Sequence, residues 1–166
     1  MKTIFSLPTD IYKNRRLIFK LAKNDFKTRY AGSYLGIVWA FIQPVITILV
    51  YWFVFSVGFR SGTGDLGVPF VLYLVAGIVP WFFFQDALIG GTNSMLEYNY
   101  LVKKVVFNIS VLPVVKIISA LFVHCFFVLF TIILYAAYGK FPDVYYFQLI
   151  YYSICVFILV LGLSYA

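Results

Sequence analysis

The sequence predicts an all-α integral membrane protein, in which an amphipathic N-terminal helix is followed by four transmembrane helices. Of its 166 residues, 63% are hydrophobic and 11% are charged, whereas about a quarter of the residues in soluble domains are charged. Residues 30–59 contain no charged side chain, and this run exceeds the roughly 20 apolar residues that a helix needs to cross a bilayer. Backbone groups in lipid must be hydrogen-bonded within their own segment, so each such run is predicted to be a helix.

The first predicted element is a basic amphipathic helix over residues 9–29, with Thr9 or Asp10 as its N-terminal cap. At about 100° per residue, one sector roughly 80° wide collects five basic side chains, and apolar side chains fill most of the remaining surface. The five are Lys13, Arg16, Lys20, Lys23 and Lys27. Such a helix lies in the membrane interface, with its lysines toward anionic lipid or a partner protein. The pattern fits a membrane anchor and a partner-binding surface equally well.

Four further runs of low charge predict transmembrane helices over residues 33–58, 68–92, 110–138 and 145–166. Pro44, Pro80 and Pro113 lie beyond the first turn of the first three predicted spans, where a proline removes a helix hydrogen bond and favours a kink. The chain ends inside the fourth run without the Lys or Arg residues that normally flank an inward-running span. We therefore expect a truncated form of a longer protein.

Gly32 and Gly36 form a GxxxG pair at the entrance to the first span. Small residues at this spacing let another helix approach closely. We interpret the pair as a helix-packing surface, with substrate contact as the alternative.

The distribution of basic residues predicts the orientation of the spans. Eight of the thirteen Lys and Arg residues precede Tyr30, and three more lie in or just after the connection between the second and third spans, while the other two connections carry one each. By the positive-inside rule, the N-terminus is cytoplasmic and the chain crosses the cell membrane several times. The first 30 residues lack a cleavable signal peptide, so the first span serves as its own insertion signal.

Several charged residues lie where apolar ones are expected. Asp25 and Arg29 are on the apolar side of the N-terminal helix, four residues apart, and could pair there. Asp86 and His124 lie inside predicted spans, where ionisable groups are costly and are functional candidates. Asp86 either faces a cavity or pairs with the basic region around Arg29, and the simplest role of His124 is an internal hydrogen bond.

Several function classes lack their usual residues. The glycines Gly62, Gly64 and Gly67 spell the dinucleotide-binding fingerprint, but no strand or βαβ unit surrounds them. Cys125 and Cys155 are isolated, so neither a metal nor a cofactor is predicted for this chain. No GxxxxGK[ST] phosphate loop is present, so any ATP that drives this protein is hydrolysed by another chain. A membrane enzyme would need paired carboxylates or a Ser/His constellation, and a channel would need a ring of polar side chains within the spans.

Two sequence blocks carry a family resemblance. The first is KNDFKTRY at residues 23–30, followed by SYLG at residues 33–36, Trp39 and Pro44. The second is GIVPWFFF at residues 77–84, followed by NYLVKKVVF at residues 99–107 and by Leu112 and Pro113. Together they resemble bacterial ABC type 2 transport permeases, in the branch that exports lipid-linked polysaccharides such as O-antigen, capsule and teichoic acid. Asn108 departs from the pattern, because the family usually has proline there.

The resemblance implies a six-helix permease, of which this chain holds four, working as a homodimer on two ATPase subunits that bind ATP and Mg²⁺. Residues 9–29, which end with Arg29, correspond to the family's interface helix. Residues 94–107 correspond to its coupling segment. We expect the coupling segment to dock into the ATPase through five residues, although its lysines are also explained as topology signals. These residues are Glu97, Tyr98, Asn99, Lys103 and Lys104.

The resemblance also implies a function, the ATP-driven export of a lipid-linked glycan across the cytoplasmic membrane. Aromatic faces can stack against sugars, so we expect a substrate path with Trp39, Phe41, Trp81 and Asp86 as its candidate residues, although ordinary packing also explains the aromatic ones. An exporter of drugs or small lipids is the nearest alternative, and a channel is a more distant one.

Overall fold

The computed structural model describes residues 2–32, 34–59, 68–97, 111–140 and 143–165, and helices account for nearly all of them. The five long helices are α1 (Lys2–Arg29), α2 (Trp39–Phe53), α3 (Phe70–Glu97), α5 (Leu112–Ala137) and α6 (Phe147–Ser164). Short 3₁₀ turns precede α2 (η1, Gly36–Val38) and α6 (η4, Val144–Tyr146), and a π-helical turn (η2, Val54–Gly58) follows α2. The predicted all-α class is therefore confirmed.

Four helical segments are long and apolar enough to cross a membrane, as the sequence predicts. They are Gly36–Gly58, Phe70–Ser94, Leu112–Ala137 and Val144–Ser164. Pro44 and Pro80 lie inside α2 and α3. Pro113, by contrast, lies in the first turn of its helix, because α5 begins at Leu112. A proline there loses no hydrogen bond, so the expected kink in the third span is wrong.

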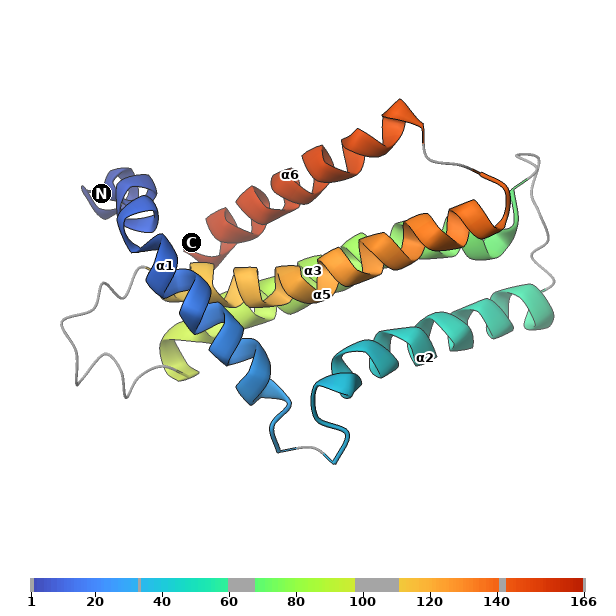
Figure 1. Ribbon diagram of the computed structural model, residues 1–166, viewed down its shortest axis with the longest axis horizontal. Helices are drawn as coiled ribbons and strands as arrows, with labels where there is room; N and C mark the ends of the chain where they lie inside the picture. The colour runs from blue at the N-terminus through green and yellow to red at the C-terminus, as the bar shows by residue number, and fades with distance from the viewer. Residues whose placement is uncertain (1, 33, 60–67, 98–110, 141–142, 166) are drawn as a thin grey trace.

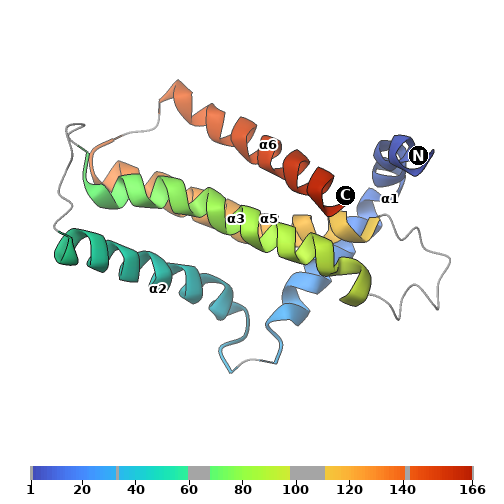
Figure 2. The same ribbon diagram turned by 180° about the vertical axis from the view of Figure 1, so that it is seen from behind.

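The antiparallel pair α3 and α5 forms the centre of the bundle, with α2 on one side and α6 on the other (Figures 1 and 2). Phe83 and Ala87 of α3 pack with Ile117 and Ala120 of α5 and with Val160 of α6 in one buried cluster. Most other side chains of α2 and α6 are exposed on the described chain. Partners for the charged residues of α3 and α5 can therefore come from this central pair or from a helix packed against it.

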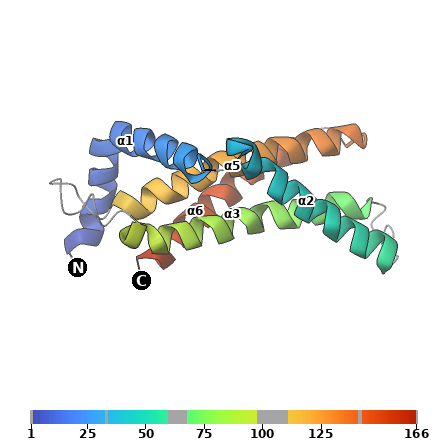
Figure 3. The same ribbon diagram turned by 90° about the horizontal axis from the view of Figure 1, so that it is seen from below.

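Helix α1 crosses the end of the bundle where α5 begins, as Figures 1 and 3 show. It begins at Lys2, not at Thr9 or Asp10. Ile18 and Ala22 are buried against Val111, Val114 and Val115. Part of the predicted lipid-facing surface of this helix therefore packs against protein. Other apolar side chains, such as Tyr12 and Phe19, remain exposed and are available to lipid.

The glycine pair at the entrance to the first span does not form a helix-packing surface within this chain. Gly32 lies in the turn after α1, and Gly36 has a φ of +54° at the start of η1, a conformation that favours glycine. A Cβ atom at either position would meet nothing within 4 Å. The two glycines do not share one helix, so the expected GxxxG packing is replaced by a turn that redirects the chain from α1 into α2.

Candidate functional site

Five charged side chains from three helices meet where α1 crosses the bundle. Asp25 and Arg29 come from α1, Asp86 and Glu97 from α3, and Lys116 from α5. The spacing within α3 explains the arrangement, because residues 86 and 97 are three turns apart and lie on the same face of the helix. On α1, Asp25 and Arg29 continue the buried stripe that begins with Ile18 and Ala22, at the i, i+4, i+7 and i+11 positions. We call these five residues the ion-pair network.

The ion-pair network is continuous from one exposed carboxylate to the other. Arg29 Nη1 donates to Asp86 Oδ1 at 2.8 Å and to Asp86 Oδ2 at 2.7 Å. Arg29 Nη2 lies 3.6 Å from Asp25 Oδ2, and Lys116 Nζ lies 2.7 Å from Asp25 Oδ1. Lys116 Nζ also donates to Glu97 Oε2. The order along the network is therefore Asp86, Arg29, Asp25, Lys116 and Glu97, with charges that alternate in sign.

Burial is concentrated at the middle of the network. Asp25 and Lys116 are each 5% exposed, whereas the side chains of Asp86 and Glu97 are 45% and 51% exposed. A buried charge is tolerated only when it is paired and hydrogen-bonded. Asp25 and Lys116 satisfy this requirement for each other, and the outer carboxylates are about half exposed on the described chain.

Gly90 makes room for the two cations. A Cβ atom at this position would lie 3.5 Å from Lys116 Cβ and 3.9 Å from Arg29 Nη2. Gly90 lies one turn after Asp86 on α3, where the side chains of both cations lie near the α3 backbone with room for no more than a methyl group. A large side chain at position 90 would occupy the space that they use.

The electrostatic balance of the network argues against binding of an anionic ligand at Arg29. Burial, the largest single effect, lowers the pKa of Arg29, but the charge and hydrogen bonds of Asp86 together with the charge of Asp25 outweigh it and raise the pKa above its ordinary value. The guanidinium lies between two carboxylates, and the five residues together carry one net negative charge, from three acids and two bases. Of the two possibilities left open for Asp86, pairing with Arg29 is therefore the one that the structure shows.

The predicted basic surface of α1 is on the side opposite to its buried stripe. All five of its members, Lys13, Arg16, Lys20, Lys23 and Lys27, are exposed. This exposure leaves them accessible to lipid headgroups or to a protein, and their role remains a prediction. Within the expected coupling segment, Glu97 is the last residue of α3. Tyr98, Asn99, Lys103 and Lys104 lie outside the described residues.

The candidate substrate-path aromatics differ in their exposure and in their ring contacts. The ring centroids of Phe41 on α2 and Phe126 on α5 are 4.3 Å apart. Trp39 is 37% exposed and Trp81 is 57% exposed. The ring of Trp81 lies 5.8 Å from that of Phe84, its neighbour one turn along α3. Phe41 therefore has a packing partner within the chain, and all three aromatic residues remain candidates for contact with substrate, lipid or a second copy.

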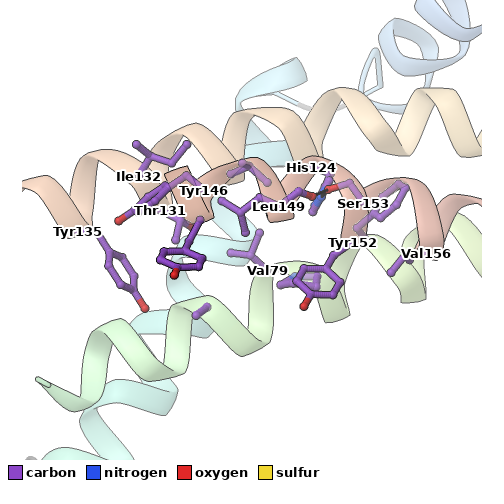
Figure 4. Close-up of a pocket in the computed structure, with 15 residues that line it drawn as sticks. Val79, His124, Thr131, Ile132, Tyr135, Tyr146, Leu149, Tyr152, Ser153 and Val156 are labelled. Atoms are coloured by element: carbon purple, nitrogen blue, oxygen red, sulfur yellow. Dashed lines mark hydrogen bonds between the residues drawn. The ribbon is translucent and has the colours of Figure 1, made fainter. Parts of the chain in front are cut away.

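A cavity of about 460 Å³, not predicted from the sequence, lies between α3, α5 and α6 (Figure 4). The surface of its lining is mostly apolar, although several lining residues carry a polar group, His124 and Ser153 among them. His124 Nε2 lies 3.0 Å from Ser153 Oγ, which donates its own proton to the carbonyl oxygen of Leu149 at 2.7 Å. The imidazole must therefore donate from Nε2, and its ring stacks on Phe83 at 4.5 Å. The internal hydrogen bond expected for His124 is therefore present.

The role of Lys116 was also not predicted from the sequence. Its position among the basic residues indicated only topology, but the structure places it at the centre of the network. The available signal was its position beside a long apolar run, since a lysine there requires a partner. Nothing in the sequence pattern identifies that partner, because Asp25 is 91 positions away.

No family profile matches the chain, but curated proteins are similar to it. It is 33% identical over 139 residues to the O-antigen export system permease protein RfbA of Myxococcus xanthus, a match that covers 82% of this chain and 51% of that protein. Two proteins of the same name from Klebsiella pneumoniae are 29% identical over 98 residues, which cover 58% of this chain and 36% of theirs. The chain thus spans about half the length of the Myxococcus relative, and less of the Klebsiella relatives.

Proposed function

We propose that this chain, which belongs to the ABC type 2 permeases, is the transmembrane subunit of an ATP-driven exporter of lipid-linked polysaccharide. The support for the class of substrate is the name of the relatives, which are O-antigen export permeases. The chain matches only part of their length, so transport by the whole protein is part of the proposal, and teichoic acid is the other lipid-linked polymer that the proposal includes as a candidate substrate.

The observation that carries the proposal is the ion-pair network at the base of four apolar helices. The network joins α1 to α3 and α5, and α1 also carries the exposed basic surface. If this end of the bundle is cytoplasmic, as the positive-inside rule predicts, α1 lies where an ATPase subunit and the inner headgroups can both reach it. We therefore place the N-terminus inside and the protein in the cytoplasmic membrane.

The partners that follow are two ATPase subunits, which bind ATP and Mg²⁺, and a second copy of the permease. The expected coupling segment, residues 94–107, begins at the end of α3 and leads toward α5. A force applied to this segment therefore acts on the central α3 and α5 pair. In this proposal, ATP hydrolysis by the partner drives transport through the docked segment.

The substrate path is proposed to use exposed aromatic side chains of two copies. Trp39 and Trp81 are exposed on the described chain, and tryptophan faces can stack on sugar rings as well as contact lipid. Replacement of both tryptophans by leucine would preserve apolar packing and remove the stacking surface. We expect this variant to slow glycan export, and full export would remove these residues from the path.

The function is tested in the bacterium that encodes the protein, with the gene tagged at its own locus and placed under depletion control. We expect an ATPase subunit to co-purify with the tagged protein. We also expect depletion to remove surface polysaccharide while polyprenyl-linked glycan accumulates on the cytoplasmic side. Normal surface polysaccharide together with increased sensitivity to drugs would overturn the proposed substrate and favour the drug-exporter alternative.

Docking of the coupling segment requires a separate test, because Glu97 also bonds Lys116 within the chain. Glu97 variants would therefore disturb two contacts at once. Asn99→Ala and the double variant Lys103→Ala/Lys104→Ala avoid this problem. We expect at least one of them to reduce ATPase co-purification, whereas normal co-purification and export in both would reject docking through these residues.

A further inference from the structure

Lys116 differs from the other basic residues around the bundle, because it is buried and joins two helices. Its ammonium bonds Asp25 of α1 and Glu97 of α3, and only 5% of the residue is exposed. The five lysines and arginines of the basic surface of α1, by contrast, are exposed. Topology requires only a positive charge near the membrane surface, which an exposed lysine provides at a lower desolvation cost. The burial of Lys116 therefore indicates a connection between helices.

The connections made by the ion-pair network form a closed triangle of helices. Arg29 joins α1 to α3 through Asp86, Lys116 joins α1 to α5 through Asp25, and Glu97 joins α3 to α5 through Lys116. Each side of the triangle is a hydrogen-bonded ion pair, and Gly90 lets the cations approach the α3 backbone. A shift of one of these helices along another at this level would therefore disturb at least one ion pair.

The contact between α1 and α5 also has an apolar part, in which Ile18 and Ala22 lie against Val111, Val114 and Val115. Apolar contact is non-directional and supplies affinity between helices without fixing their register. Buried ion pairs contribute little net stability compared with apolar side chains of similar volume. The ion pairs therefore add a fixed position along the helix axes to a contact that apolar packing already stabilises.

We propose that Asp25 and Lys116 are positioning residues that hold α1 in register with the bases of α3 and α5 and thereby couple α1 to movements of the segment between those two helices. Glu97 and Lys116 lie on either side of residues 98–110, so displacement of that segment reaches the network directly. Arg29 ends α1, and the turn that follows leads into the first span. Movement at the coupling segment is thus passed to the entrance of α2. This inference rests on the proposed function, because it assumes that an ATPase acts on that segment.

The test uses the full-length permease with its ATPase in proteoliposomes, and compares ATP hydrolysis with glycan export. The informative variant is Asp25→Asn/Lys116→Met, which removes both buried charges while keeping similar side-chain volumes. We expect it to assemble and hydrolyse ATP at the wild-type rate, while export falls about tenfold, within the usual range of energetic coupling between sites. Lys140→Met removes an exposed charge at the other end of the bundle and is the matched control, with unchanged export.

A second readout does not depend on the substrate. In a background without Cys125 and Cys155, the variants Ala22→Cys and Val115→Cys place a cysteine on each side of the apolar contact. We expect disulfide formation between them to be independent of nucleotide in the intact network, and to change with ATP once Asp25→Asn/Lys116→Met is added.

The outcomes separate the inference from the proposed function. Export and ATP hydrolysis both at the wild-type level in the double variant would overturn the inference, as would loss of assembly or of both activities, which would indicate a structural role. Nucleotide-independent cross-linking in the double variant would also overturn it. Failure of the wild-type protein to export glycan, despite ATP-dependent cross-linking in the double variant, would overturn the proposed substrate and leave the positioning role supported.

Discussion

Gly91 of α3 lies so close to Ser164 of α6 that a Cβ atom at position 91 would be 2.4 Å from Ser164 Oγ and 3.2 Å from Ser164 Cβ. The preceding residue, Gly90, faces Lys116 and Arg29, at distances that correspond to ordinary van der Waals contact. Two consecutive glycines thus serve different neighbours. Gly91 permits the approach of α6, and Gly90 permits the approach of the network cations.

The two glycines should respond differently to alanine. We expect Gly91→Ala to destabilise the protein by about 1–3 kcal/mol, because the new methyl group overpacks the contact with α6. Gly90→Ala should be neutral or slightly stabilising, because its methyl group fits and alanine favours helix by about 1 kcal/mol. Thermal unfolding of the purified protein in detergent measures both.

Ser164→Gly supplies the control for this pair. Added to Gly91→Ala, it removes the atoms that the methyl group would meet, so it should restore most of the lost stability. If Gly91→Ala unfolds at the same temperature as Gly90→Ala, the close approach of α3 and α6 is wrong.

Removal of Lys116 alone should be more damaging than removal of its pair with Asp25. Lys116→Met takes the nearer cation away from a carboxylate that is 5% exposed, and breaking a buried ion pair in this way typically costs about 3–5 kcal/mol. The double variant Asp25→Asn/Lys116→Met should recover much of this loss, because no charge is left buried at that point. Unfolding temperatures of the two singles and the double, analysed as a mutant cycle, give the coupling energy, and additive effects would contradict the pairing.

Asp86→Asn should have a smaller effect, because the carboxylate of Asp86 is 45% exposed. Ion pairs with solvent access contribute roughly 0–1 kcal/mol, so we expect a shift in unfolding temperature well below that of Lys116→Met. The same detergent assay provides the comparison. A loss as large as that of Lys116→Met would show that the arginine and aspartate pair is shielded from solvent by something beyond this chain.

The hydrogen bond between His124 and Ser153 makes a prediction inside the bundle. Ser153→Ala removes the acceptor of the Nε2 proton, and an unsatisfied buried donor costs about 1–3 kcal/mol. The double variant His124→Leu/Ser153→Ala replaces both polar partners and should be more stable than Ser153→Ala alone. Equal stability of the two variants, measured by thermal unfolding, would indicate that the imidazole has another acceptor.

The orientation of the spans is tested by cysteine labelling of intact cells. In a variant without Cys125 and Cys155, we expect Lys140→Cys to react with a membrane-impermeant maleimide from outside. Lys104→Cys should react only after the membrane is permeabilised, because the positive-inside rule places it in the cytoplasm. The opposite pattern of labelling would reverse the proposed topology.

The sequence predicts best those features that depend only on the composition of one segment. Hydropathy gave the existence of all four membrane-spanning helices, although α3 continues to Glu97 and α5 begins at Leu112. Prediction was less accurate where the role of a residue depends on where a helix begins or on the backbone conformation. The later start of α5 turned Pro113 from an interior residue into a first-turn residue, and the positive φ of Gly36 turned a packing motif into a turn.

The sequence by itself determined the all-helical class, the spans and the predicted side of the basic residues, because transfer of a segment into lipid depends on the composition of that segment. Only the tertiary structure decided which charged residues meet. Asp25 and Lys116 are 91 positions apart, and Arg29 and Asp86 are 57 apart, so their pairing depends on how α1 crosses the α3 and α5 pair. An unpaired charge near lipid shows that a partner is required, but the identity of the partner depends on the packing of whole helices.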